Sequence, residues 1–304
     1  MRVFVTGASG FIGSAVVPEL IGAGHQVVGL ARSDASAEAL TAAGAAVHRG
    51  SLEDLDSLRA GAAAADGVIH LAFIHDFSQH ENAARIDLRA IETIGAVLEG
   101  SARPLVIASG TVGLPSGRVA TEEDFPVPGS VASARGAAAQ TTLALAERGV
   151  RSSVLRLPPS VHDEGDHGFI PTLIGIAREK GVSGYIGDGS NRWCTVHRRD
   201  AARLFRLAVE QAPAGSVLHG TAEEGVPVRT IAELIGRHLG VPTTSVAPDD
   251  AERHFGWLGR FLTADVPTSS DKTRALLGWQ PTHPELIADL EQGHYFRTDR
   301  PSPQ

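Results

Sequence analysis

Short apolar runs alternate with longer stretches in which apolar residues recur every three or four positions. The apolar runs have the length of strands, and we predict six of them, at 3–6, 26–31, 46–49, 67–72, 105–109 and 152–157. The amphipathic stretches between them predict helices at 12–24, 35–43, 55–63, 80–99 and 132–148. This alternation predicts βαβ units, a parallel sheet and helices on both of its faces.

The rhythm changes after Pro158 and Pro159, where loops rich in His, Asp and Gly separate further helical stretches. We expect these helices near 170–180, 200–211, 230–239, 249–261 and 284–293, and a strand at 217–219 that can return to the main sheet. The chain therefore predicts an α/β fold. A Rossmann-like, doubly wound parallel sheet occupies residues 1–159, and a smaller, mostly helical substrate lobe occupies 160–304.

Composition narrows the class of protein. The chain has 304 residues, of which 42% are hydrophobic, so it can bury a sizeable core. A single cysteine excludes an intramolecular disulfide and a cysteine-based structural zinc site. A net charge of −8 without a long basic run argues against nucleic acid or an anionic membrane as partner. With no export signal or membrane span, we expect a cytoplasmic monomer or homodimer.

The first predicted strand runs into a glycine-rich motif, Thr6-Gly7-Ala8-Ser9-Gly10-Phe11-Ile12-Gly13, which opens the first predicted helix. Gly7 permits the sharp turn, Gly10 lets the backbone approach a pyrophosphate, and Gly13 lets helix and strand pack closely. The helix N-terminus adds amide donors and the positive end of a dipole. The motif and its context predict a dinucleotide site.

Further residues at the ends of strands complete this predicted site. Arg32 and Ser33 stand at the tip of the second strand, where an acidic residue would favour NAD and a basic one accommodates the 2′-phosphate of NADP. We therefore expect NADP, with NAD as second choice, although Arg32 is also consistent with a solvated surface charge. The other predicted cofactor contacts are Ser51, Leu52, Leu71, Ala72 and Pro158.

These segments resemble the extended and atypical short-chain dehydrogenases/reductases, which are relatives of the NAD-dependent epimerases/dehydratases. The resemblance rests on 6–13, 68–72, 106–111, 154–158 and 187–200. It implies a catalytic Ser or Thr after the fifth strand and a Tyr-x-x-x-Lys motif on the next helix. In this family the Tyr exchanges a proton with the substrate oxygen, while the Lys lowers the pKa of the Tyr and holds the nicotinamide ribose.

The chain matches only part of that catalytic set. Ser109 and Thr111 match the first element, but the helix after them has neither Tyr nor Lys. Arg135 stands where the Lys would be, and we predict that it holds a ribose or pyrophosphate. An exposed helix charge is an equally good interpretation. Arginine has too high a pKa to donate a proton readily, and the two tyrosines of the chain, Tyr185 and Tyr295, lie far downstream.

Histidine is the natural replacement as a proton donor because its pKa lies near neutrality. Several histidines follow strands whose ends meet at the predicted cleft, and one tryptophan lies close by in sequence. We predict substrate contacts from His75, His162, His167, Trp193 and His197. The His and Asp residues at 162–167 lack the spacing of a metal-binding motif, so we predict no metal site.

The leading hypothesis is an NADP-dependent oxidoreductase that acts on a small organic carbonyl, alcohol or activated alkene. A non-redox isomerase, dehydratase or cyclase with the same pocket is a second hypothesis. A catalytically silent NADP-sensing binding protein is the third, because the Tyr-x-x-x-Lys pair is absent.

Overall fold

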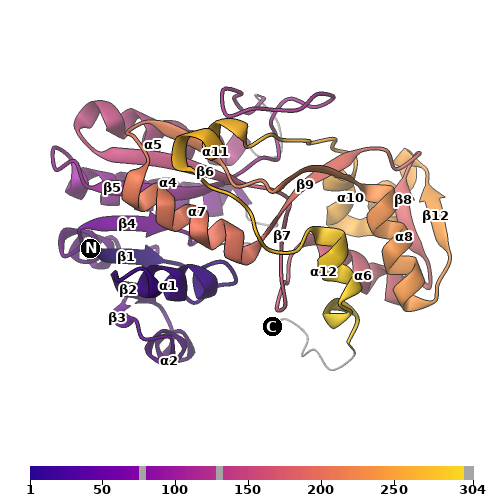
Figure 1. The fold of residues 1–304 in the computed structure, drawn as a ribbon, viewed down its shortest axis with the longest axis horizontal. Coiled ribbons are helices and arrows are strands. Elements are labelled where there is room, and N and C mark those ends of the chain that lie inside the picture. Colours follow the sequence, from indigo (N-terminus) through magenta and orange to yellow (C-terminus); the bar gives the residue numbers. More distant parts are fainter. Residues whose placement is uncertain (75–79, 128–132, 298–304) are drawn as a thin grey trace.

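A seven-stranded parallel sheet forms the larger half of the molecule in the computed structural model, which describes residues 1–74, 80–127 and 133–297 (Figure 1). The strand order is β10-β6-β5-β4-β1-β2-β3. The strands are β1 (Arg2–Thr6), β2 (Gln26–Ala31), β3 (Ala46–Arg49), β4 (Gly67–His70), β5 (Pro104–Gly110), β6 (Arg151–Leu157) and β10 (Ser216–His219). The order reverses between β1 and β4, and the predicted α/β fold is confirmed.

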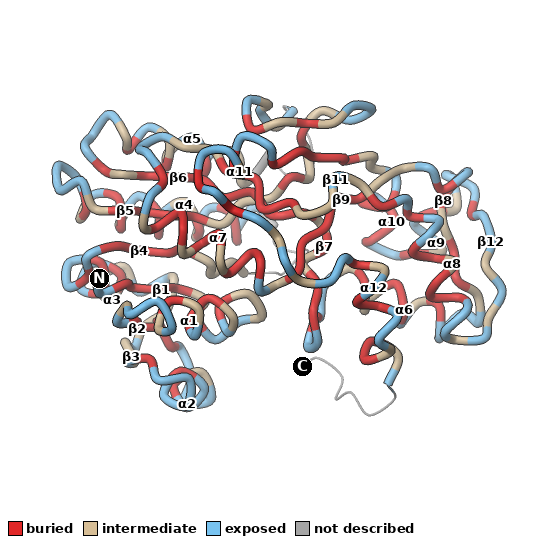
Figure 2. Tube along the Cα trace, in the orientation of Figure 1, coloured by how far each residue is buried: buried red, intermediate tan, exposed pale blue. Residues whose placement is uncertain are grey.

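Helices cover both faces of this sheet because alternate residues of each strand are apolar on opposite sides. Val3 and Val5 face a core that includes α1 (Gly13–Gly22), while Phe4 between them faces a second core. The first core is completed by α2 (Asp34–Ala42), α7 (Arg198–Gln211) and the end of α11 (Asp271–Leu277). The second is formed by α3 (Leu55–Ala63), α4 (His80–Leu98) and α5 (Ser133–Ala144). Figure 2 shows the central strands buried over most of their length.

The smaller half has a core of its own, built around helices and two short sheets. Its helices are α6 (Phe169–Lys180), α8 (Val228–Leu239), α9 (Ala251–Phe255), α10 (Gly259–Leu262) and α12 (Leu286–Glu291). One sheet joins β7 (Ser160–His162), β9 (Arg192–His197) and β11 (Glu223–Pro227), and the other joins β8 (Ser183–Ile186) to β12 (Thr243–Val246). Among the described residues, no helix is both long and apolar enough to cross a membrane.

One feature of the later chain differs from the pattern expected from sequence. The single helix expected at 249–261 is broken, because Gly256 adopts a left-handed φ of +58° between α9 and α10. The strand expected at 217–219 does return to the main sheet, where β10 pairs with β6, and α7 also packs against this sheet.

Candidate active site

The glycine motif after β1 is built so tightly that two of its positions exclude a side chain. Gly7 has a φ of +68°, and a Cβ there would lie 2.7 Å from the Ala72 nitrogen. A Cβ on Gly13 would lie 2.1 Å from the Gly7 carbonyl oxygen. Any larger residue at either position would push the turn away from β4 or from α1.

The same turn presents unused hydrogen-bond donors. Ser9 and Gly10 are exposed, and the N–H groups of Phe11 and Ile12 have no acceptor within the described residues. These groups lie just before α1, where the helix dipole favours an anion. The turn therefore fits the pyrophosphate of a dinucleotide.

The tip of β2 carries a positive charge rather than a negative one. Arg32 is exposed and has no ion pair or hydrogen bond within the described part of the chain. Ser33 accepts a hydrogen bond from the Ser36 N–H at 3.2 Å and thereby caps α2. Asp34 is paired with Arg49 at 2.7 Å.

The loops after β3 and β4 contribute mainly through backbone geometry. The Ser51 hydroxyl accepts hydrogen bonds from two backbone N–H groups of its own turn, beside the half-buried Leu52. The Leu71 N–H donates to the Thr6 carbonyl at 3.1 Å, and the Ala72 N–H donates to the Thr6 hydroxyl at 3.3 Å. These bonds hold the end of β4 against the glycine motif.

A buried chain of polar groups runs from the glycine motif to α4. The Thr6 hydroxyl lies 2.9 Å from His70 Nδ1, and His70 Nε2 lies 3.0 Å from Asp87 Oδ1. Because the Asp87 carboxylate can only accept, the ring donates to it through Nε2, and in a neutral ring Nδ1 then accepts the Thr6 hydroxyl proton while the Thr6 oxygen accepts the Ala72 N–H. His70 and Asp87 are each 1% exposed, so neither is available to solvent.

Arg135 connects this chain to the cleft. Its Nη2 donates to the Ala108 carbonyl at 2.8 Å, its Nε lies 3.8 Å from Asp87 Oδ2, and its guanidinium lies 4.2 Å from the Phe73 ring centroid. Burial lowers the pKa of Arg135 while Asp87 opposes this shift, and the guanidinium remains charged at neutral pH. The side chain is 21% exposed, and its Nη1 has no partner within the described residues.

The two hydroxyls predicted at the end of β5 differ in their surroundings. Ser109, next to Ala108, is half-buried, and its hydroxyl has no partner within the described residues. Thr111 is completely buried, with its Oγ1 3.4 Å from the sulfur of Cys194. Burial raises the pKa of the Cys194 thiol. Pro158 follows β6, the strand beside β5, and is buried. The geometry thus leaves Ser109 open to a ligand and points Thr111 into the interior.

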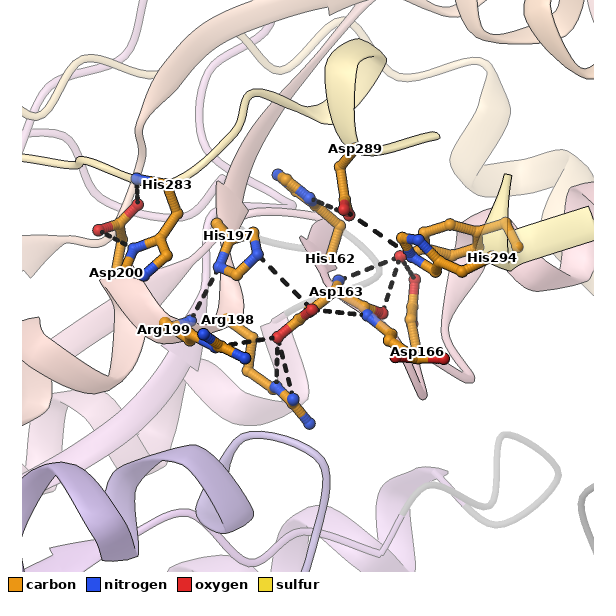
Figure 3. Close-up of polar contacts among 12 residues, drawn as sticks. His162, Asp163, Asp166, His197, Arg198, Arg199, Asp200, His283, Asp289 and His294 are labelled. Atoms are coloured by element: carbon orange, nitrogen blue, oxygen red, sulfur yellow. Dashed lines mark hydrogen bonds and ion pairs between the residues drawn. The ribbon is translucent and has the colours of Figure 1, made fainter. Parts of the chain in front are cut away.

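Two of the four histidines predicted to contact substrate, His162 and His197, lie in a separate polar cluster, drawn in Figure 3. His162 Nδ1 lies 2.9 Å from Asp289 Oδ2, and the ring is 1% exposed. His197 accepts the Arg199 N–H through Nδ1 at 3.2 Å, and its Nε2 lies 3.6 Å from Asp163. Burial lowers the pKa of His197 to about 4, although Asp163 opposes the shift. Both rings are held by protein groups.

The remaining predicted residues lie apart from one another. His167 is exposed and meets the Phe11 ring edge-on at 5.7 Å, beside the glycine motif. Trp193 is 1% exposed and packs on Phe169. His75 lies outside the described residues.

Three groups in this cluster have the spacing of metal ligands, but they are already engaged in hydrogen bonds or ion pairs with the protein. Donor atoms of Asp163, His197 and Asp289 lie within 4.8 Å of one another. However, Asp163 already binds Arg198 at 2.9 Å. His197 Nδ1 accepts an N–H, so a neutral ring carries its proton on Nε2, the atom that would have to bind the metal. This arrangement suits a hydrogen-bonded cluster better than a metal ion.

Both tyrosines of the chain are engaged away from Ser109. The Tyr295 hydroxyl accepts the Asp163 N–H at 3.2 Å and lies 3.0 Å from Asp166 Oδ2. Burial raises the pKa of Asp166 to about 6. Tyr185 lies in β8, where Arg229 stacks on its ring at 5.4 Å.

Sequence reasoning missed Asp87, which fixes Arg135. A signal was present: Asp87 shares one face of its helix with Ala90, Ile91 and Ile94, all of which are buried. A carboxylate on the apolar face of a helix is buried only when it is paired. The partner could not be identified without the fold, because His70 and Arg135 come from other elements.

A parallel sheet with a glycine turn at the N-terminus of its first helix defines a dinucleotide-binding protein of the Rossmann class. Residues 3–219 match the model of the NAD dependent epimerase/dehydratase family, and the chain belongs to this family. It is 52% identical over 301 residues to an uncharacterised protein of Schizosaccharomyces pombe, covering 97% of this chain and 100% of the relative.

Two further similarities concern proteins with named activities. A 4-hydroxy-2-methyl-3-oxo-4-farnesyl-3,4-dihydroquinoline-1-oxide ketoreductase of Stigmatella aurantiaca is 27% identical, with 96% of each chain covered. A structure of the dTDP-glucose 4,6-dehydratase DesIV of Streptomyces venezuelae, with NAD and TYD bound, superposes with a TM-score of 0.79 at 19% identity, covering 99% of this chain and 98% of that one. The latter likeness shows a shared fold.

Proposed function

We propose that the chain is an NADP-dependent oxidoreductase acting on a small organic carbonyl, alcohol or activated alkene. The observation that carries the proposal is that Arg135 donates to the carbonyl of Ala108, the residue before Ser109, so that two polar groups lie near the end of β5. Within the described residues, Ser109 has an unused hydroxyl, and Arg135 is fixed by Ala108 and Asp87 with one nitrogen left unused. The similarity to a ketoreductase supports the redox assignment.

The residues of the cleft have separable tasks in this proposal. A bound nicotinamide cofactor supplies the hydride, and the protein aligns the reacting groups. The Ser109 hydroxyl donates a hydrogen bond to the substrate oxygen. Arg135 donates from Nη1 to the nicotinamide ribose, while Asp87 and Phe73 hold the guanidinium in place. The Phe11 and Ile12 N–H groups hold the pyrophosphate.

The preference for NADP over NAD rests on Arg32. Its guanidinium at the tip of β2, without a partner in the described part of the chain, suits a 2′-phosphate, and the neighbouring Asp34 is occupied by Arg49. We expect Arg32→Ala to weaken NADPH binding about tenfold and to leave NADH binding unchanged, as for the loss of one charge-assisted contact. Fluorescence titration of the two cofactors measures this directly.

The proton donor must come from a group other than those held in place by the protein. Arg135 cannot serve, and His162 and His197 are held in the buried cluster. Of the histidines predicted to contact substrate, His75, which follows β4, and the exposed His167 stay candidates for the donor, and pH–rate profiles of His75→Gln and His167→Gln test them. Three further expectations stay predictions. They are the substrate contacts from His167 and Trp193, the cytoplasmic location, and the monomeric or dimeric state.

The direct test mixes the protein with NADPH and a panel of ketones, aldehydes and enones while absorbance reports oxidation of the cofactor. We expect turnover with at least one substrate class and its loss in Ser109→Ala. Arg59→Gln, a change in an exposed ion pair on α3, is the matched control. Tight NADPH binding without turnover of any substrate would contradict the oxidoreductase and favour a sensing protein. Substrate conversion without net oxidation would favour an isomerase or dehydratase.

A further inference from the structure

A cavity of about 450 Å³ lies between α1 and α7, on the face of the sheet that these two helices cover. It follows α1 from Ser14, in the first turn of the helix, to Glu19. We call it the α1–α7 groove; its polar lining includes Ser14, Glu19, Arg198, Arg199, Arg203 and His283. Pockets of this volume bind small molecules in other proteins.

Two of the arginines that line the α1–α7 groove have no carboxylate of their own nearby among the described residues. Arg203 has no ion pair or hydrogen bond from its side chain within the described ranges of the chain. Arg199 is 65% exposed, and its Nε lies 3.7 Å from Asp163, a carboxylate already bound by Arg198 at 2.9 Å (Figure 3). Uncompensated positive charge in a chain of net charge −8 indicates a site for an anion.

The acidic side chain that lines the groove, Glu19, is occupied. Glu19 Oε1 accepts from Arg206 Nε at 2.7 Å, and the same guanidinium binds Glu210 at 3.0 Å. Among the described residues, Glu19 therefore forms its ion pair with Arg206 and none with Arg199 or Arg203. These two arginines are four residues apart on α7, so their stems project from the same face of the helix about 6 Å apart.

The α1–α7 groove is separate from the dinucleotide turn. The turn offers the N–H groups of Phe11 and Ile12, whereas the groove begins further along α1, at Ser14. Arg198 marks the boundary, because its guanidinium lies 4.7 Å from the Phe11 ring centroid and its Nη1 lies 3.5 Å from the Ser14 hydroxyl.

We infer that the α1–α7 groove binds a small metabolite with two anionic groups, either phosphates or carboxylates, through Arg199 and Arg203. Guanidinium groups form paired hydrogen bonds with both kinds of oxyanion, so the side chains define the charge of the ligand and its two-point attachment. The inference goes beyond the proposed function and does not depend on it.

Isothermal titration calorimetry of the full chain tests the inference. With the dinucleotide site saturated by NADPH, the protein is titrated with pyrophosphate and, in a separate arm, with citrate. We expect saturable binding of at least one, and the stronger arm identifies the ligand as a phosphate or a carboxylate compound. Arg203→Gln should weaken this binding about tenfold, as for the loss of one charge-assisted contact. Arg237→Gln, a change at an exposed position of α8, should leave it unchanged.

Two results would overturn the inference: no saturable binding in either arm, or equal affinity in the parent protein and in Arg203→Gln. Far-UV circular dichroism of each variant establishes that it is folded, and Arg199→Gln gives a second, independent readout of the same site. If NADPH itself fails to bind, the proposed function fails, and the titration without NADPH still decides the groove through Arg203→Gln.

Discussion

Two clusters in the molecule each consist of a histidine, an aspartate and an arginine. They differ in how many hydrogen-bond donors of the arginine have a partner in the protein. They are the Arg135 cluster, made of His70, Asp87 and Arg135, and the Arg198 cluster, made of His197, Asp163 and Arg198. In both, the aspartate lies between the ring and the guanidinium. The residue types alone therefore cannot separate a functional group from a structural one.

The difference lies in the arginines. Arg135 contacts Asp87 through one nitrogen, at 3.8 Å, donates to the Ala108 carbonyl through a second, and among the described residues has no partner at Nη1. Arg198 binds Asp163 through two nitrogens, at 3.2 and 2.9 Å, and packs on Phe11. The Arg198 cluster thus joins the smaller half to the glycine motif. In the Arg135 cluster, by contrast, the Arg135 Nη1 donor is left without a partner among the described residues. Unused hydrogen-bonding capacity, rather than composition, marks the candidate site.

The largest expected effect is the loss of unfolding free energy when the aspartate of each cluster is replaced, and it should differ between the two clusters. Asp87→Ala leaves the buried His70 ring and the Arg135 charge without their partner, so we expect unfolding free energy to fall by about 3 to 5 kcal/mol. Asp163→Ala is the matched change in the Arg198 cluster. The Asp163 side chain is 12% exposed, against 1% for Asp87, and Arg199 beside it is largely exposed, so here we expect about 1 to 2 kcal/mol. Urea unfolding measures both, and equal losses would remove the distinction.

A second prediction concerns pH and applies to the neighbourhood of Arg198. Burial raises the folded pKa of Asp166 from 3.8 to about 6, so its contribution to stability is full below about pH 4 and is lost as pH rises through 6. Burial lowers the folded pKa of His197 from 6.5 to about 4, so its contribution is present above 6.5 and is lost as pH falls through 4. Between about pH 4 and about pH 6, Asp166 therefore makes the unfolding free energy fall with rising pH, whereas His197 makes it rise.

In the parent protein the effects of Asp166 and His197 on the pH dependence of unfolding free energy partly cancel. Substituting one of the two residues should therefore reveal the effect of the other. Relative to the parent, Asp166→Asn should gain up to about 3 kcal/mol of unfolding free energy between about pH 4 and about pH 6. His197→Gln should lose less stability than the parent on acidification over that range. Urea unfolding at several pH values gives both curves. Curves that run parallel to that of the parent would contradict the assigned burial of these groups.

The smallest effect concerns the link between the Arg198 cluster and the cofactor. Arg198→Gln removes the cation from the face of Phe11, an interaction worth about 0.5 to 1 kcal/mol at a partly exposed site. We expect NADPH affinity to fall a few-fold, with the turnover number nearly unchanged. Arg203→Gln, further along α7, is the control and should not alter NADPH affinity. A large drop in turnover for Arg198→Gln would mean that this cluster takes part in the chemistry.

Local pattern was sufficient to predict the larger half of the fold. The second and third strands occur at the predicted residues, 26–31 and 46–49, each a short segment between turn signals. Gly7 was predicted from the turn that it permits and Gly13 from the close packing of helix and strand, and the close contacts that a Cβ would make at each position agree with these requirements. These features depend on neighbours in sequence, which pattern reasoning can evaluate.

The rest depends on contacts between distant segments. The short strands β8 and β12 pair although about 60 residues separate them in the chain, and neither has a strong alternation of its own. Asp87 and Arg135 meet only when α4 and α5 pack together. The hydroxyls of Ser109 and Thr111 are two residues apart and equivalent in sequence, yet one meets the cleft and the other meets Cys194.

That last contrast provides the most direct test of the central claim that Ser109, at the end of β5 with Arg135, is the group that contacts the substrate. Single-turnover oxidation of NADPH is measured for Ser109→Ala and Thr111→Val with the best substrate of the panel. We predict that Ser109→Ala slows hydride transfer about 100-fold with NADPH affinity unchanged, as for the loss of one donor to a developing oxyanion. Thr111→Val should retain the rate within a few-fold. A parent-like rate in Ser109→Ala would contradict the account.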